Sequence, residues 1–174
     1  MAKNLLSLLL GGDRRSIGRA DQVAVAVSRN PALFPMLMQG WWSDDPLVRM
    51  RAADATEKVT RKNPDLLIPY KMKLLKLLPD AEQQELRWHL AALVPRLPLS
   101  RRQRYLAASA LRLYLQDQSS IVKTCALQAL ADLAEDEPTM RPEVKKLLCQ
   151  SLRNGTPAMK ARSRRLLRQL DSDD

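Results

Sequence analysis

The sequence predicts an all-α fold, an α-solenoid of about five helical hairpins in a single domain. Glycine supplies only 5 of the 174 residues and aromatic residues only 4%, a composition unfavourable for a β-sheet protein. A polar turn residue also recurs along the chain at intervals of 32 to 37 residues, a spacing typical of helical repeats. These turn residues are Asp13, Asp45, Asp80, Asp117 and Asn154.

Each turn is followed by one pattern, an apolar residue and then, in most units, a basic residue, leading into small and apolar side chains at helical spacing. The equivalent pairs are Ile17-Gly18, Val48-Arg49, Leu86-Arg87, Val122-Lys123 and Met159-Lys160. A second helical stripe precedes each turn, for example Leu67, Leu74 and Leu78. We therefore expect two helices per unit and the units 2–30, 31–63, 64–99, 100–138 and 139–170. Residues 1–170 then form one repeat domain, and residues 171–174 form a short acidic tail.

Capping residues mark where these helices begin. Four polar residues stand directly before a proline, an arrangement typical of a helix N-terminus. They are Asn30, Asp45, Asn63 and Thr156. Ser100 with Gln103, and Asp80 with Gln83, have the spacing of capping boxes.

The proline-started first helix, the Asp turn and the Val-Arg or Val-Lys pair before Ala and Leu are most regular in residues 45–59 and 117–133. In these features the chain resembles HEAT-repeat proteins over essentially its whole length. The match is weakest in the first unit, where Gly18 stands in place of the basic residue. The resemblance implies a right-handed α-solenoid whose second helices line the concave side, and a role in scaffolding or recognition.

The charge and the cysteine content narrow the class of protein. A formal net charge of +10 favours anionic partners. The chain contains only two cysteines, Cys125 and Cys149, which are too few for a disulfide framework. This low cysteine content fits the reducing environment of the cytoplasm. The apolar run Leu5–Leu10 is short for a signal peptide, and no run approaches the roughly 18 apolar residues of a membrane span. We therefore expect a cytoplasmic protein without a membrane partner.

The helical period projects one face of the second helices towards solvent, and this face is the candidate binding surface. On the helix that follows Asp117, this face includes Gln128 and Asp132. The residues that we expect to bind a ligand are Arg51, Asp54, Trp88, His89, Arg162, Arg165 and Arg168. Trp88 would supply an apolar anchor and the arginines charge-assisted hydrogen bonds. In the alternative interpretation, Trp88 fills a groove between helices and His89 is a hydrogen-bonded structural residue.

Positive charge is concentrated near the C-terminus, where residues 141–168 contain nine basic residues and only Glu143 as an acidic one. Three interpretations remain open: a solvated face of a terminal repeat, a site for phosphate or nucleic acid, or a docking site for an acidic protein. The basic residues that follow the turns, Arg49, Arg87, Lys123 and Lys160, are expected to pair with the turn residues Asp45, Asp80 and Asp117.

The function predicted from the sequence is a non-enzymatic binding or scaffold module that recognises an acidic protein or peptide through the concave face. The alternative is a nucleic-acid-binding protein related to the HEAT-like alkylpurine DNA glycosylases. Those enzymes place tryptophans and an aspartate in a basic groove, whereas one helical turn from Trp88 this chain has Ala92, and one turn from Asp54 it has Met50. No catalytic or cofactor motif is recognised. His89 and Cys125 share a register, but no further histidine exists, so no metal site is expected.

Overall fold

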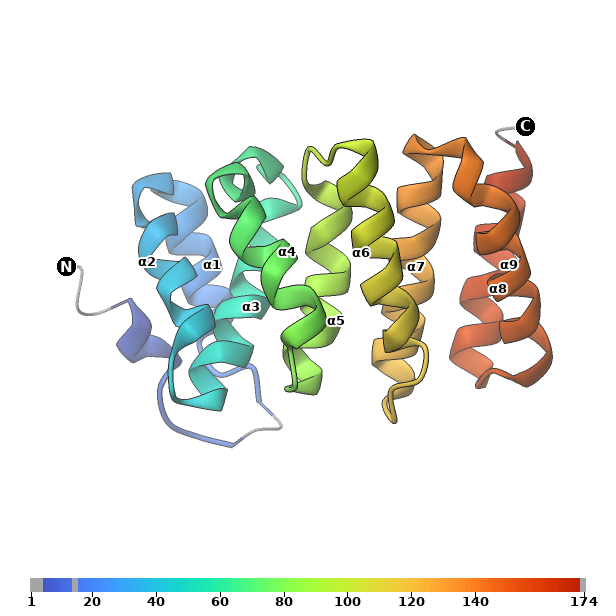
Figure 1. Cartoon of the computed structure of the whole chain (residues 1–174). Helices are drawn as coiled ribbons and strands as arrows, with labels where there is room; N and C mark the ends of the chain where they lie inside the picture. The colour runs from blue at the N-terminus through green and yellow to red at the C-terminus, as the bar shows by residue number, and fades with distance from the viewer. Residues whose placement is uncertain (1–4, 14–15, 173–174) are drawn as a thin grey trace. The chain divides into compact units, whose positions relative to one another are not determined.

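Residues 5–13 and 16–172 are described by this computed structural model, and they form helices, turns and short connections. Over these two ranges no β-strand occurs, which confirms the predicted all-α class. The chain divides into two units, Met1–Lys71 and Met72–Asp174. Figure 1 shows the helices in their order along the chain.

Helix α3 is the central element of the first unit. It packs against α1, α2 and the short 3-10 helix η2. The α-helices of this unit are α1 (Ala20–Arg29), α2 (Phe34–Gln39) and α3 (Pro46–Thr60); the 3-10 helices are η2 (Leu6–Leu9), η3 (Pro31–Leu33), η4 (Gly40–Trp42) and η5 (Pro64–Tyr70). Trp41 is buried, and its Nε1 donates a hydrogen bond of 3.0 Å to Thr56 Oγ1. Trp42 is exposed.

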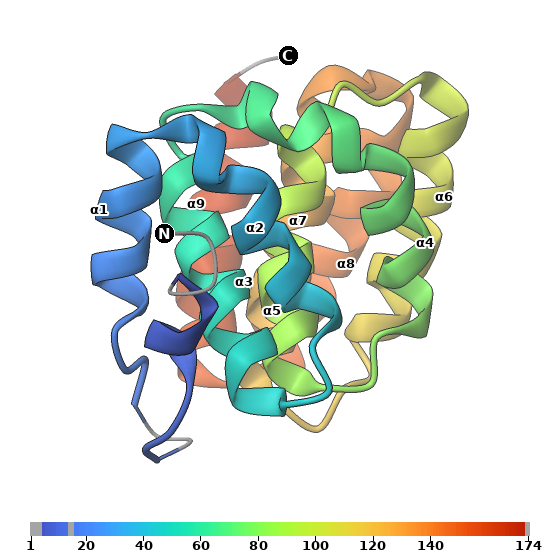
Figure 2. The same ribbon diagram turned by 90° about the vertical axis from the view of Figure 1, so that its left-hand side faces the viewer.

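The second unit consists of helices in two layers, with α4, α6 and α8 in one and α5, α7 and α9 in the other (Figures 1 and 2). Its α-helices are α4 (Lys71–Asp80), α5 (Gln84–Leu93), α6 (Arg101–Tyr114), α7 (Ser120–Asp136), α8 (Arg141–Asn154) and α9 (Pro157–Ser172), with 3-10 helices η6 (Val94–Arg96) and η7 (Pro138–Met140). α7 packs against α5, α6, α8 and α9, and its alanine-rich face explains this central position, since small side chains let neighbouring helices approach.

The helices fall where the repeat pattern places them, with departures at both ends. α4 with α5 and α6 with α7 lie within the predicted hairpins 64–99 and 100–138. In the first hairpin, the only helix before α1 among the described residues is the single turn η2. α9 continues to Ser172, so Asp171 is helical and does not belong to a separate acidic tail; residues 173–174 of that predicted tail lie outside the described residues.

The predicted caps are confirmed at three helices. The Asp45 side chain accepts from Leu47 N at 2.8 Å, and the Thr156 hydroxyl accepts from Met159 N at 3.4 Å. Ser100 and Gln103 form the complete capping box of α6.

The other predicted caps are wrong. Asn30 and Asn63 precede 3-10 helices and make no side-chain cap. Asp80 is the last residue of α4, because α5 begins only at Gln84; the predicted capping box with Gln83 is therefore not formed. A polar residue before proline thus marked the boundary correctly even where its side chain does not cap.

Leu130 on α7 tests the helix register. It is 2% exposed. We expect Leu130→Ala to lower the free energy of unfolding by about 2–5 kcal/mol, because it leaves a cavity that the packed helices cannot fill. Urea denaturation followed by circular dichroism measures this, with the exposed Leu113→Ala on α6 as the control, for which we expect about 0.5 kcal/mol or less. Equal losses in the two variants would contradict the register.

Candidate functional site

Four side chains from α7 and α9 form a polar cluster in the second unit, called here the Arg–Gln–Asp cluster. Its members are Gln128, Asp132, Arg162 and Arg165. Gln128 Oε1 accepts hydrogen bonds from Arg162 Nη1 at 2.7 Å and from Arg165 Nη2 at 2.5 Å. Gln128 Nε2 donates to Asp132 Oδ1 at 2.6 Å. One side-chain amide therefore links a carboxylate to two guanidinium groups.

Helical spacing and repeat spacing together bring these groups into contact. Gln128 and Asp132 lie one turn apart on α7, and Arg162 and Arg165 lie one turn apart on α9, so each pair shares a helix face. The separation between Gln128 and Arg162 is 34 residues, which falls within the interval of the repeated turns. Equivalent faces of two successive second helices therefore meet, because α7 and α9 pack against each other.

Burial perturbs the acidic member of the cluster. Desolvation raises the pKa of the Asp132 carboxyl above its ordinary value. The hydrogen bond from Gln128 and the positive charges of Arg96 and of the two cluster arginines act in the opposite direction without cancelling it. Asp132 is one carboxylate beside two guanidinium groups, so the cluster contains more cationic than anionic side chains.

A cavity of about 400 Å³ borders the cluster on the side of α5 and η6. Its lining residues are Ala92, Pro95, Arg96, Gln128, Asp132, Glu135 and Asp136. Its carboxylates are engaged: Asp136 pairs with Arg104 at 3.2 Å, and Glu135 accepts from Gln169. The cluster therefore has an acidic side on α7 and a basic side on α9.

The remaining predicted arginine of the last unit, Arg168, is exposed on α9 and lies outside the cluster. Its Nε donates to the backbone carbonyl of Arg164 at 3.3 Å. It therefore adds positive charge to this helix without sharing the hydrogen bonds of Gln128.

Trp88 and His89 lie side by side on α5, with ring centroids 5.8 Å apart and planes inclined at 58°. His89 is buried and Trp88 is half-buried. The prediction that His89 faces solvent is wrong, because it lies three residues after Leu86 and four before Leu93, on the apolar stripe that the helix buries. Among the side chains of this pair, only Trp88 retains part of its surface for contact with a ligand.

Arg51 is the clearest correction to the predicted binding surface, since it is 1% exposed. Its guanidinium donates hydrogen bonds to four backbone carbonyls of the segment that precedes α1. The acceptors are Leu9 O at 2.8 Å, Gly11 O at 2.5 Å, Asp13 O at 3.1 Å and Ser16 O at 3.2 Å. Arg51 therefore holds this segment on α3, and its polar atoms are occupied within the chain.

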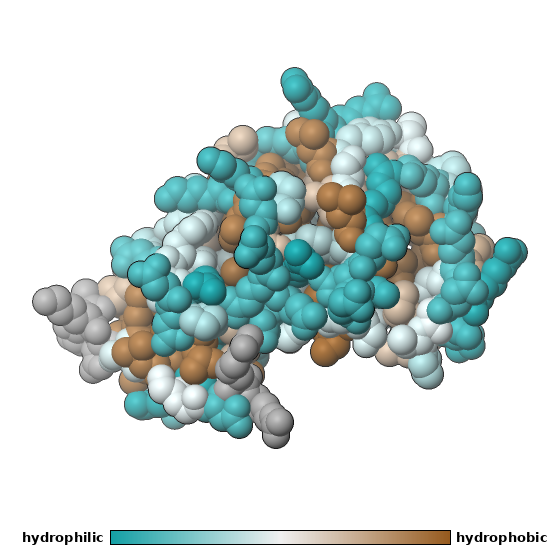
Figure 3. Space-filling model, turned by 60° about the horizontal axis from the view of Figure 1, so that its bottom comes forward, coloured by the Kyte–Doolittle hydropathy of each residue, from teal (hydrophilic) through white to brown (hydrophobic). Residues whose placement is uncertain are grey.

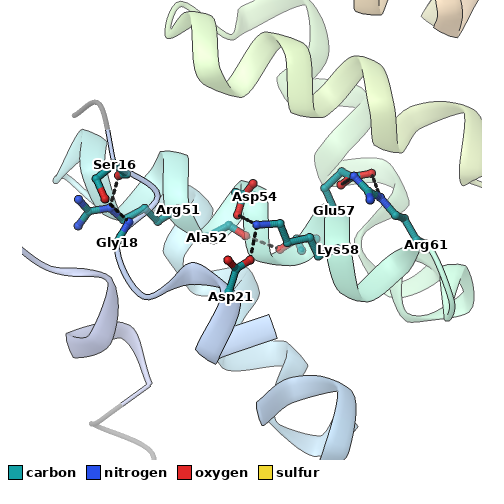
Figure 4. A network of polar contacts seen from close by, with 10 residues as sticks. Ser16, Gly18, Asp21, Arg51, Ala52, Asp54, Glu57, Lys58 and Arg61 are labelled. Atoms are coloured by element: carbon teal, nitrogen blue, oxygen red, sulfur yellow. Dashed lines mark hydrogen bonds and ion pairs between the residues drawn. The ribbon is translucent and has the colours of Figure 1, made fainter. Parts of the chain in front are cut away.

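Gly18 explains why the first unit departs from the repeat pattern. Figure 4 shows the residue beside the Arg51 side chain. Its φ is +55°, and a Cβ at this position would lie 2.9 Å from Arg51 Cζ. A larger residue would therefore be strained and would displace the guanidinium group.

Asp54 is half-buried and is engaged in an ion-pair network of the first unit. Lys58 Nζ lies 2.7 Å from Asp54 Oδ2 and 2.5 Å from Asp21 Oδ1 (Figure 4). Burial opposes the charge of Lys58, but hydrogen bonds to these two carboxylates outweigh it and raise its pKa. Through Lys58, Asp54 therefore takes part in an ion-pair network that joins α1 and α3.

The errors at Arg51 and His89 have one cause. Arg51 lies three positions after buried Val48, and His89 lies three positions after buried Leu86. Side chains three positions apart lie on the same face of a helix. Gln128 and Asp132, which are six and ten positions after Val122, do reach the surface of α7. The repeat interval between α7 and α9 was the signal that could have paired Gln128 with the two arginines.

None of the protein-family models, curated proteins and solved structures compared with the chain matches it. The resemblance to HEAT repeats therefore stays a prediction from the sequence pattern. Within residues 5–13 and 16–172, no helix is both long and apolar enough to cross a membrane. The same described residues contain no group of three or more His, Cys, Asp or Glu side chains placed to hold a metal ion.

Proposed function

We propose that the protein is a non-enzymatic binding module that holds an acidic segment of a protein partner at the Arg–Gln–Asp cluster. The observation that carries this proposal is the sharing of one neutral acceptor, Gln128 Oε1, by the guanidinium groups of Arg162 and Arg165. An amide oxygen is a weaker partner for a guanidinium group than a carboxylate, which carries charge and accepts two parallel hydrogen bonds. A ligand carboxylate therefore gains more at this position than the resident amide supplies.

Asp132 acts in this proposal as a positioning residue. By accepting from Gln128 Nε2, it turns the amide oxygen towards α9 and so holds the two guanidinium groups close together. Placing two cations side by side before the ligand arrives lowers the conformational entropy lost on binding. The half-buried ring of Trp88 on α5 offers an apolar contact within the same unit.

The repeat architecture supports a role in recognition. The paired helices α4–α5, α6–α7 and α8–α9 are consistent with an α-solenoid of the HEAT type, in which second helices present a binding face. We propose that the whole chain forms a right-handed solenoid of about five such hairpins. We also propose that the protein is cytoplasmic. The cluster and not the architecture carries the proposed function, because one helical-repeat fold serves many ligands.

The proposal is tested by fluorescence anisotropy with a labelled oligoglutamate peptide. We expect the double variant Arg162→Gln and Arg165→Gln to weaken binding by about tenfold or more, because both charge-assisted contacts are lost. The matched control is the double variant Arg153→Gln and Arg164→Gln, which removes the same charge from exposed positions outside the cluster. Equal weakening by both pairs would show that oligoglutamate responds only to overall charge and would overturn the proposal.

The row Arg162, Arg165 and Arg168 on α9 supports nucleic acid as the second candidate ligand. A labelled DNA duplex distinguishes the two. Duplex affinity is expected to fall by orders of magnitude between about 50 and 200 mM salt if several phosphates are contacted. Tighter binding of the duplex than of oligoglutamate at about 150 mM salt, lost in the Arg162 and Arg165 variant, would favour the nucleic-acid function.

A further inference from the structure

The second unit has another surface with a different chemistry, on the layer opposite the cluster. Between α4 and α6 lies an open cavity of about 640 Å³, called here the α4–α6 groove. Met72 on α4 and Leu106 and Leu113 on α6 line it and are 64%, 61% and 67% exposed. On the face drawn in Figure 3, hydrophobic side chains stand in groups between hydrophilic ones. In the α4–α6 groove, exposed hydrophobic side chains gather along two neighbouring helices.

The groove exists because small side chains lie between long ones. Ala107 and Ala110 face it from α6, and the hydrogen bond from Tyr114 Oη to Leu78 O, 2.6 Å long, joins the two helices near their C-terminal ends. The other edge of α6 makes polar contacts with the following elements. There Tyr105 Oη bonds to Thr139 Oγ1 at 2.7 Å, and Arg112 pairs with Glu143. One edge of α6 is therefore joined to its neighbours by polar contacts, while the edge towards α4 keeps an apolar hollow.

The α4–α6 groove is long enough to hold a helix, and it runs along the axes of α4 and α6. Its lining on α6 extends from Gln103 to Leu113, a distance of about three helical turns. α4 and α6 run in the same direction, because Met72 contacts Gln103 near their beginnings and Leu78 contacts Tyr114 near their ends. A trough between two parallel helices accepts a third helix through apolar residues spaced three and four apart.

Charge indicates which helix fits. Lys76 lines the groove, none of the lining residues that the structure describes is acidic, and exposed Arg102 stands one turn before Leu106 on the same face of α6. A second copy of this chain, bound through the same surface by twofold symmetry, would bring these cations close to their own copies. A partner with acidic residues beside its apolar stripe gains attraction from them instead.

We propose that the α4–α6 groove docks an amphipathic helix of a protein partner whose apolar stripe is flanked by acidic residues. This goes beyond the proposed function, since the groove and the cluster share no residue. A protein that binds one segment at each surface could link two partners, or grip one partner twice and gain from effective concentration.

The test begins with a phage-displayed library of random peptides selected on the intact protein. We expect the enriched peptides to share apolar residues at i, i+3 or i+4 and i+7, together with an excess of Asp and Glu. One such peptide is then synthesised, labelled and titrated. The double variant Leu106→Glu and Leu113→Glu is expected to weaken its binding by about 30-fold or more, because the apolar contact is lost. Both leucines are exposed, so thermal unfolding is expected to show that this variant stays folded.

Three further variants identify the surface and its charge preference. Ile121→Glu alters an exposed apolar residue outside the groove and is expected to change affinity less than about twofold. Arg162→Gln with Arg165→Gln is expected to leave peptide binding unchanged, even if oligoglutamate no longer binds. Lys76→Glu with Arg102→Glu is expected to weaken the acidic peptide by about tenfold and to shift selection towards Lys and Arg.

Several outcomes would overturn the proposal. One is a selection that enriches no peptide, or peptides without the apolar stripe or the acidic excess. Another is peptide binding that survives the leucine variant, or that is lost in the Arg162 and Arg165 variant. Self-association of the protein that Leu106→Glu abolishes would assign the groove to a second copy of the chain.

Discussion

Replacing Arg51 by alanine is expected to lower the free energy of unfolding by about 3 kcal/mol or more, because several hydrogen bonds to a charged group are lost together. The guanidinium of Arg51 donates to four backbone carbonyls before α1, and the residue is fully buried. Without it, that segment loses its attachment and a cavity remains beside α3. Lysine cannot substitute, since a single ammonium group cannot reach acceptors arranged around a planar guanidinium.

Urea denaturation followed by circular dichroism measures this effect. The control is Arg29→Ala, which removes an exposed arginine from the last turn of α1 and is expected to cost about 0.5 kcal/mol or less. Limited proteolysis gives a second measurement, since we expect residues 9–13 to be cleaved faster in the Arg51 variant. A cost below about 1 kcal/mol for Arg51→Ala would show that the four hydrogen bonds do not hold the segment.

The helices could be predicted from the sequence because their signals are local. Proline after a polar residue, apolar stripes and the interval between turns each depend on a few neighbouring positions. The single helical turn η2 before α1 escaped the pattern, because its form depends on contacts with Arg51, which lies far along the sequence. Gly18 departs from the repeat pattern because the guanidinium group of Arg51 lies beside it and leaves no room for a side chain.

The candidate site was predicted in part, and the errors have a physical basis. Arg162 and Arg165 do lie together at the surface of α9, as the helical projection expects. Gln128, which joins them, is uncharged and belongs to no motif, so only the contact between α7 and α9 shows its importance. The α4–α6 groove was not found from the sequence, because an exposed leucine on a helix has the same pattern as a buried one.

One of the predicted pairs of a basic residue with a turn residue is Arg87 of α5 with Asp117, which lies in the turn before α7. Asp117 in that turn has a side chain only 2% exposed. Its Oδ2 lies 2.5 Å from Arg87 Nη1, and its Oδ1 accepts from Ser119 N at 2.7 Å. Arg87 also lies over the ring of Tyr114, 5.7 Å from its centroid. This single carboxylate therefore connects α5 to the turn between α6 and α7.

Replacing Asp117 by alanine is expected to lower the free energy of unfolding by about 3 kcal/mol, because it leaves a partly buried guanidinium without its counter-ion and a turn N–H without its acceptor. Asp117→Asn keeps the shape but loses the charge, and we expect a smaller loss of about 1–2 kcal/mol. The control is Asp136→Ala, which removes an exposed partner of Arg104 and is expected to cost less than about 1 kcal/mol. Urea denaturation of the variants gives all three values.

The same carboxylate predicts how stability depends on pH. Burial alone would raise the pKa of Asp117, but hydrogen bonds from Ser119 and Arg87 outweigh it and lower that pKa. A folded-state pKa below the unfolded value of about 3.9 means that the stabilisation is complete above that value and is lost as pH falls through the folded pKa. The difference in unfolding free energy between the unmodified protein and Asp117→Asn should therefore be constant from about pH 5 to pH 8 and shrink below about pH 4. A difference that stays constant down to about pH 2 would contradict a charged pair as its origin.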